Sequence, residues 1–225
     1  MKKLISLFYF VPAMAFAQFE GSKQTFESPN LTTAIASHRM VAILPFDVRI
    51  TYRKQPKNLN LEAEREQESK MSTTIQGSLY TYLLRRSTDY PVNLQNVDET
   101  NLLLKRAGME GKLDQFTKQE IAEALGVDAV MGGRFETKQT QSELTAIAAM
   151  VLLDGAGGRT GTGSLTLTLN NGADGELLWR FYKSMDDNVI ASATNLVERM
   201  MRKVSRNFPY MDKASEKPIK VLSER

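Results

Sequence analysis

The sequence predicts an α/β (α+β) protein in which helices pack on a mixed β-sheet. An apolar run at 41–44 is typical of a buried strand, and residues 61–87 place apolar side chains three and four positions apart, which is typical of a helix. Strand-like segments at 128–137, 165–169 and 177–182 then follow shorter helical ones. Strands and helices that alternate along one chain favour a sheet with helices packed on it.

The N-terminus has the layout of a cleaved secretory signal. Lys2 and Lys3 form a positive start, an apolar run follows at 4–14, and a small-x-small site ends at Ala17, just before Gln18. The alternative is a membrane anchor, but a spanning helix needs about 20 apolar residues, and this run is too short. We therefore expect cleavage between Ala17 and Gln18 and a periplasmic or secreted location.

Composition and charge limit the classes of function. Of 225 residues, 42% are hydrophobic and 24% are charged, as in globular proteins. The net charge of +3 falls to +1 when Lys2 and Lys3 are lost with the signal, so the chain lacks the basic excess of a nucleic-acid binder. The chain has no cysteine, which excludes disulfides, thiolate zinc sites and a lipid anchor on cysteine.

The pattern along the chain predicts one domain with extensions. Local signals include a capping box at Thr117 and Glu120, a helix-ending Gly126, and Gly132-Gly133, which suggests a bulge or a close backbone approach. Pro45 should loosen strand pairing after 41–44. We divide the chain into a signal peptide (1–17), an N-terminal arm (18–39), a single α/β domain (40–211) with an apolar and glycine-rich insertion (142–163), and a charged C-terminal tail (212–225).

The C-terminal half predicts a β-hairpin followed by a helix. Leucines alternate with threonines over 165–169, the turn NNGADG follows, and apolar and polar residues alternate again over 177–182. The alternation makes Trp179 a core residue rather than a binding platform. Apolar residues at helical spacing over 189–204 predict a last amphipathic helix.

The insertion contains an apolar segment whose role stays open. Residues 144–153 (LTAIAAMVLL) carry no charge, and as a helix they would be about 15 Å long, which is half of the roughly 30 Å hydrocarbon core. The segment must therefore pack in its own domain, against a partner, or on a membrane surface. We predict self-association or partner contact through four candidate residues: Leu144, Ile147, Met150 and Val151.

Three segments together resemble an envelope family. Residues 41–46 (VAILPF), 124–133 (ALGVDAVMGG) and 175–179 (GELLW) resemble the first strand, the helix-glycine-strand step and the hairpin of that family. It includes the curli secretion channel subunit, the activator lipoprotein of penicillin-binding proteins and the N-terminal domain of the Tol propeller protein. The resemblance implies a domain similar to anticodon-binding domains that serves binding and assembly. The chain departs from the lipoprotein members by having Gln18 where they have cysteine.

We find no catalytic, cofactor or metal motif in the sequence. The glycine-rich 155–161 has Thr160 where both phosphate-binding glycine motifs need glycine, and no lysine follows. We expect His38 at the surface, since no partner is patterned around it, and Asp47 as a simple loop acid rather than a strand-end site. Asp186-Asp187 should cap the last helix rather than bind a cation.

These observations leave three hypotheses for function. The first is a non-enzymatic envelope protein that acts in binding or assembly with a protein partner, with no cofactor. The second is a subunit of an oligomeric outer-membrane secretion or pore complex. The third, an enzyme with a carboxylate site, has no motif to support it. Peripheral membrane contact through the apolar segment remains compatible with the first two.

Replacing Ala17 with a bulky charged residue should block cleavage, because signal peptidase accepts only small residues at this position. Mass spectrometry of the secreted chain measures the result. A mature N-terminus that stays at Gln18 in the Ala17→Arg variant would contradict the predicted site.

The Ile147→Asp, Val151→Asp double variant tests the apolar segment. If the segment is an interface, the variant keeps its circular dichroism spectrum and loses its oligomeric state or partner. Global unfolding would instead place the segment in the core, and a folded variant with unchanged assembly would contradict both interpretations.

Overall fold

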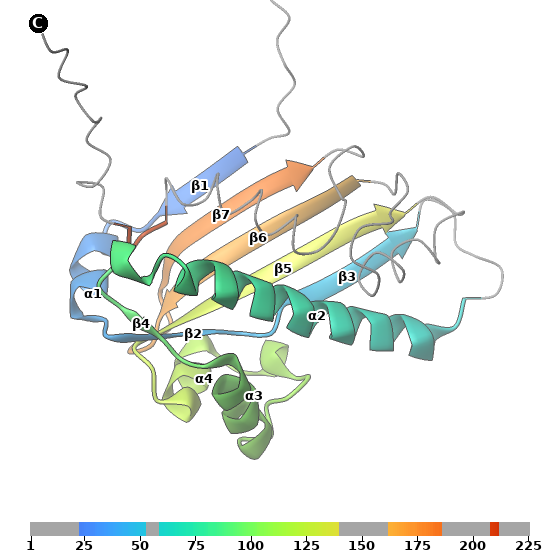
Figure 1. Cartoon of the computed structure of the whole chain (residues 1–225), viewed down its shortest axis with the longest axis horizontal. Helices are drawn as coiled ribbons and strands as arrows, with labels where there is room; N and C mark the ends of the chain where they lie inside the picture. The colour runs from blue at the N-terminus through green and yellow to red at the C-terminus, as the bar shows by residue number, and fades with distance from the viewer. Residues whose placement is uncertain (1–22, 53–58, 140–161, 186–207, 212–225) are drawn as a thin grey trace, which may run out of the picture.

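The protein forms a seven-stranded mixed sheet with helices on it, which confirms the predicted fold class (Figure 1). The computed structural model describes residues 23–52, 59–139, 162–185 and 208–211. The strands are β1 (Lys23–Glu27), β2 (Met40–Ile43), β3 (Asp47–Tyr52), β4 (Asn93–Leu94), β5 (Ala129–Gln139), β6 (Thr162–Asn171) and β7 (Leu177–Met185). The helices are α1 (Leu31–Ser37), α2 (Leu61–Leu84), α3 (Val97–Arg106) and α4 (Lys118–Leu125), with 3₁₀ turns at Ser87–Asp89 and Leu113–Gln115.

Strand β5 organises the sheet. The order across the sheet is β1-β7-β6-β5-β2-β4, and β3 also pairs with β5. On one side β5 pairs with β6 in antiparallel fashion. On the other side it pairs with two parallel strands in succession, β2 opposite residues 129–131 and β3 opposite residues 134–139. One long strand thus aligns two consecutive short ones.

The break between β2 and β3 falls at Pro45, as the sequence predicts. The Leu44 N–H still donates to Met131 O at 2.9 Å, but a proline cannot donate a backbone hydrogen bond, so pairing stops at Pro45 and resumes with β3 at Asp47. The ring of Phe46, in the same gap, covers Gly133, where an added Cβ would lie 2.2 Å from a ring carbon. The expected close approach at Gly132-Gly133 is confirmed. The alternative of a bulge there is wrong, because the β5–β6 register is continuous and the irregularity lies between β6 and β7.

Helix α2 covers one face of the sheet (Figure 1). Asn60 begins it by accepting hydrogen bonds from the N–H groups of Glu62 and Ala63, at 3.0 and 3.2 Å. The face predicted from the spacing is buried in the main core: Met71, Ile75, Leu79 and Leu83. Glu68 of α2 also accepts the Ile50 N–H at 2.9 Å, which satisfies a backbone donor of β3.

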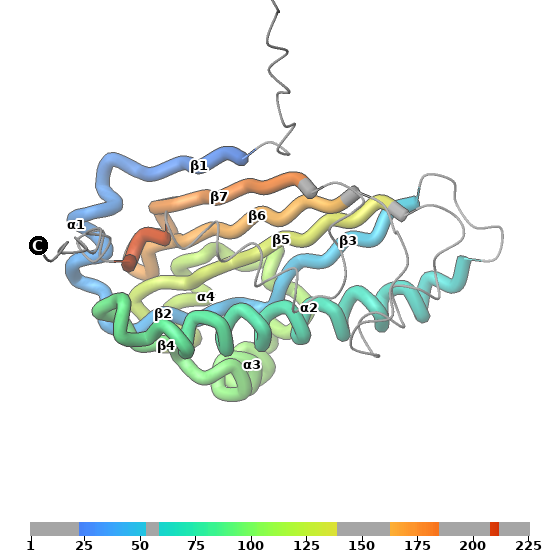
Figure 2. The backbone as a smooth tube through the Cα atoms, turned by 45° about the horizontal axis from the view of Figure 1, so that its top comes forward, coloured from blue at the N-terminus to red at the C-terminus, as the bar shows by residue number. Residues whose placement is uncertain are grey.

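Helices α3 and α4 cover part of the opposite face. They bury Ala42, Leu44 and Val130 in a second, smaller core beside β2 and the start of β5. The predicted capping box at the start of α4 is present, and Gly126 ends the helix with φ 65°, a conformation that favours glycine. In Figure 2, α3 lies on the β2–β4 side of the sheet, away from β1. The two helices therefore leave much of this face uncovered within the described residues.

The N-terminal region differs from the expected arm. From Lys23 onward it contributes an edge strand and a helix, and β1 pairs with β7 in antiparallel fashion. Glu176, before β7, accepts hydrogen bonds from the Ser28 hydroxyl at 2.5 Å and the Asn30 amide at 3.2 Å. The sequence did not predict this strand, because all five β1 side chains are exposed and apolar residues therefore do not alternate along it. Strand β3 was likewise not predicted.

An aromatic cluster closes the core near the end of the described chain. Trp179 stacks on Phe181 with ring centroids 6.0 Å apart and meets Phe208 edge-on at 6.2 Å. Phe208 in turn contacts Tyr90 and Tyr210. The indole of Trp179 is fully buried, which confirms its predicted core position, and its Nε1 has no hydrogen-bond partner among the described residues.

Some expectations concern residues outside the described ranges. These are the signal peptide and its site at Ala17 and Gln18, the candidate segment with Leu144, Ile147, Met150 and Val151, the pair Asp186-Asp187, the helix over 189–204, and the tail over 212–225. None of the helices in the described residues combines the length and the apolar character that crossing a membrane requires.

Trp179→Ala should lower the free energy of unfolding by about 3–5 kcal/mol, because it removes a fully buried ring and leaves a cavity. Trp179→Phe is the matched control and should cost clearly less, since the indole N–H makes no hydrogen bond to any described residue. Urea unfolding of both variants measures the difference. Equal stability of Trp179→Ala and the parent would contradict the core assignment.

Candidate interaction surface

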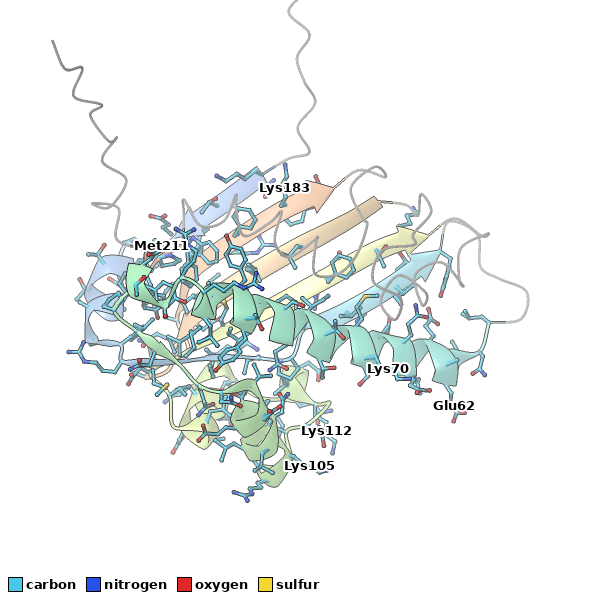
Figure 3. The ribbon with its side chains drawn as sticks, in the orientation of Figure 1. Glu62, Lys70, Lys105, Lys112, Lys183 and Met211 are labelled. Carbon is cyan, nitrogen blue, oxygen red and sulfur yellow. The ribbon has the colours of Figure 1, made fainter. Side chains whose placement is uncertain are left out.

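The sheet has one face that the described helices cover only in part. On β3, β5, β6 and β7, alternate side chains enter the core under α2, and the others point away from it. Lys183, labelled in Figure 3 on β7, belongs to the core side and is largely buried. We call the opposite side, beyond the reach of α3 and α4, the open face: Gln24, Phe26, Asp47, Arg49, Gly132, Arg134, Glu136, Ser164, Thr166, Thr168, Arg180, Tyr182 and Ser184.

The strand register aligns these side chains in rows across the sheet. Arg134 on β5 lies opposite Asp47 on β3 and opposite Thr166 on β6. Thr166 lies opposite Tyr182 on β7, and Tyr182 opposite Gln24 on β1. Residues from five strands thus form one continuous polar row.

Ion pairs order one end of this row. A guanidinium nitrogen of Arg134 lies 2.8 Å from Asp47 Oδ2, and Nε of Arg49 lies 3.1 Å from Asp47 Oδ1. Glu136 lies 3.9 Å from the other side of the Arg134 guanidinium. All four side chains are substantially exposed, and exposed ion pairs contribute about 0–1 kcal/mol to stability. The cluster therefore orients charged groups at the surface more than it stabilises the fold.

The structure places the sequence-predicted site residues apart from one another. Asp47, expected as a loop acid, is the first residue of β3 and pairs with two arginines. Trp179 lies in the core. The prediction of a surface position for His38 is wrong, because only 3% of it is exposed. Its Nδ1 lies 2.6 Å from the Tyr210 hydroxyl and its Nε2 3.3 Å from Asn171 Oδ1.

His38 belongs to a polar junction that holds the end of the sheet together. Asp128, before β5, accepts the backbone N–H groups of Arg39 and Met40 at 2.7 and 2.9 Å. Its own backbone oxygen accepts the Gly172 N–H at 2.7 Å. These contacts join β2, β5 and the hairpin turn, so the junction has a structural role.

The open face offers polar groups for binding. The described residues contain no group of three or more His, Cys, Asp or Glu side chains placed to hold a metal ion. Apart from Phe26 and Gly132, the open face carries arginine, tyrosine, glutamine, serine, threonine and carboxylate side chains, which bind by hydrogen bonds and ion pairs. The arrangement is suited to recognition of a polar surface.

Sequence reasoning missed the open face, although part of its signal was present. The alternation of apolar and polar residues over 165–169 and 177–182 indicates which side chains of β6 and β7 lie on the polar side of the sheet. The sequence DVRITY indicates the same for β3. The sequence does not state which strands are neighbours. The row from Asp47 to Gln24 depends on that order, so only the tertiary structure assembles it.

Comparison of the sequence with protein-family models and with curated proteins finds no match. Comparison of the fold finds similar solved structures. A lipoprotein from Neisseria meningitidis is 14% identical, with 75% of this chain and 94% of that chain covered and a TM-score of 0.44.

Two further structures show the same likeness. The C-terminal domain of LpoB from Salmonella enterica is 11% identical, with 70% of this chain and 93% of that chain covered and a TM-score of 0.37. A subunit of the PelC dodecamer from Paraburkholderia phytofirmans is 14% identical, with 86% and 99% covered and a TM-score of 0.35. LpoB is the activator of penicillin-binding proteins that the sequence resemblance names. At these identities and TM-scores the likenesses carry no conclusion about what this chain binds or does.

The pKa of Asp128 makes the junction sensitive to acid. Burial raises this pKa, but the N–H groups of Arg39 and Met40 together with nearby positive charge hold it below its usual value. Because the folded pKa lies below the unfolded value of about 3.9, the stabilisation is complete above that pH and is lost as the pH falls through the folded pKa.

Asp128→Ala should therefore lower the free energy of unfolding at pH 7 by about 1–2 kcal/mol, since two hydrogen bonds to a charged acceptor are lost at a partly exposed site. Asp128→Asn keeps an acceptor without the charge and should lose less stability than the parent between pH 5 and pH 3. Urea unfolding across this range measures both. Parallel stability curves for the parent and Asp128→Asn would contradict the assignment.

Proposed function

We propose that this chain is a non-enzymatic periplasmic or secreted protein of the cell envelope that binds a protein partner through its open face. The signal-peptide layout supports the location, and the family resemblance supports a role in binding or assembly. The observation that carries the proposal is the open face itself, a polar row that spans five strands beside a cluster of ordered ion pairs.

The chemistry of the open face favours a protein partner. Arginine and tyrosine side chains, which protein interfaces use most as anchors, stand on it at Arg134, Arg180 and Tyr182. Acidic groups at Asp47 and Glu136 lie among the arginines, so the face carries both signs of charge. A surface for nucleic acid or for anionic lipid needs a concentrated positive charge instead. Mixed charge suits the mixed charge of another protein surface.

A second candidate is a subunit of an oligomeric outer-membrane secretion or pore complex. The observation that favours it is the position of the uncharged run at 144–153. The insertion leaves after β5 and returns at β6, where Lys138 and Thr162 are direct cross-strand neighbours. An insertion whose ends lie side by side in this way can be long without changing the sheet. Its apolar run then has to be buried against its own domain, another chain or a membrane.

A photo-crosslinking side chain in place of Tyr182 tests the first candidate in intact cells. We expect a single adduct with a protein partner, because the side chain stands within the row, between Thr166 and Gln24. The same crosslinker in place of Leu102, which is 47% exposed on α3, is the control and should give none. Adding Arg134→Glu should remove the adduct while leaving the fold intact, since the ion pairs contribute little stability.

Two outcomes would contradict this proposal. Adducts of equal yield from both positions, or from neither, would show that the open face is not the binding surface. Steady turnover of an envelope substrate that a point mutation abolishes would replace binding with catalysis.

A further inference from the structure

Strand β1 presents a sheet edge that no other described strand covers. It is the last strand in the sheet order and pairs only with β7 (Figure 2). All five of its residues are exposed, from Lys23 to Glu27, and Phe26 is 48% exposed. An edge strand with unpaired backbone groups is a template for another strand.

The pairing with β7 fixes which backbone groups face outward. The Ser28 N–H donates to Leu178 O at 2.8 Å, so this pair is hydrogen-bonded across the two strands. Hydrogen-bonded pairs alternate along an antiparallel ladder, so Gln24 and Phe26 also direct their N–H and C=O groups to β7. Lys23, Thr25 and Glu27 therefore direct theirs outward, to the free side.

The sequence of β1 is complementary to itself in one antiparallel register. The strand is Lys-Gln-Thr-Phe-Glu. When two copies run antiparallel with Thr25 opposite Thr25, each Lys23 stands opposite the other copy's Glu27, and the outward-facing residues face one another. A register shifted by two residues keeps the outward groups in line but shortens the ladder and separates both charge pairs. A one-residue slip sets outward groups against inward ones.

We propose that two copies of this chain pair through their β1 edges, antiparallel and centred on Thr25, so that one sheet continues into the other. The occupant of the edge is a second copy because the charge order of β1 matches its own reverse. Lysine on an edge strand ordinarily discourages pairing, but here the opposing glutamate compensates it. The open face continues across the junction with Gln24 opposite Phe26, so the dimer doubles the surface of the proposed function and does not depend on it.

A disulfide trap tests the register. Opposed residues of a hydrogen-bonded pair have Cα atoms about 5.5 Å apart, within the range of about 4.4–6.8 Å that a disulfide spans. The chain has no cysteine of its own, so Thr25→Cys introduces a single thiol. We expect the full-length secreted Thr25→Cys chain to form a covalent dimer on mild oxidation. Gln24→Cys is the matched control and should stay monomeric on a denaturing gel, because it faces Phe26 rather than itself.

A charge exchange tests the contacts. Lys23→Glu alone and Glu27→Lys alone each place two pairs of like charges across the junction. Sedimentation should show dimerisation weakened about 30-fold in either variant, since two cross-strand pairs change from attraction to repulsion. The double variant Lys23→Glu, Glu27→Lys should recover the dimer. An equal mixture of the two single variants should also dimerise, because each then meets the opposite charge.

Three results would overturn the proposal. The first is an unmodified chain that sediments as a monomer at all concentrations. The second is equal crosslinking of Thr25→Cys and Gln24→Cys. The third is a dimer that is indifferent to all the charge variants. The photo-crosslinking result at Tyr182 is independent of these, so failure of the dimer and failure of the proposed function are distinguishable.

Discussion

The fold depends on the close approach of Phe46 to Gly133. Because Gly133 has no side chain, the Phe46 ring can lie on the middle of β5 while the chain passes from β2 to β3. This packing lets one strand of 11 residues align two short parallel strands in succession. The site where α3 and α4 pack, beside β2, is thereby separated from the site where the polar row begins, at β3.

As a result, one face of the sheet is buried in the main core and the other is only partly covered. Under α2, aliphatic and aromatic side chains from the strands form the main core, which the Trp179 cluster closes. On the other side, α3 and α4 bury side chains around Val130 only, and the row from Asp47 to Gln24 follows beyond them. The polar half of each alternating strand thus becomes a surface, and the arrangement of the helices decides how much of it stays available.

Polar contacts, beside the buried Leu31 of α1, hold the N-terminal segment to the sheet. Glu176 binds Ser28 and Asn30, Asp128 binds the backbone at Arg39 and Met40, and His38 bridges Tyr210 and Asn171. Each contact joins residues far apart in sequence. Together they hold β1 at the edge, where its outward-facing backbone groups become the basis of the inferred pairing.

The sequence by itself determined the elements whose signals are local. The capping box at Thr117 and Glu120, the left-handed Gly126, the alternation of the hairpin and the apolar face of α2 all act between residues that are close along the chain, so their patterns are visible in it. The fold class and the core position of Trp179 followed from them.

Only the tertiary structure decided the rest. Strand β1 carries no apolar alternation because none of its side chains is buried, and its pairing depends on β7, more than 150 residues away. His38 looked isolated because its partners, Asn171 and Tyr210, are distant in sequence. The open face could be recognised only once the order of the strands in the sheet was known. The alternation of side chains along a strand shows which of them share a face, but it does not show which strand lies beside it.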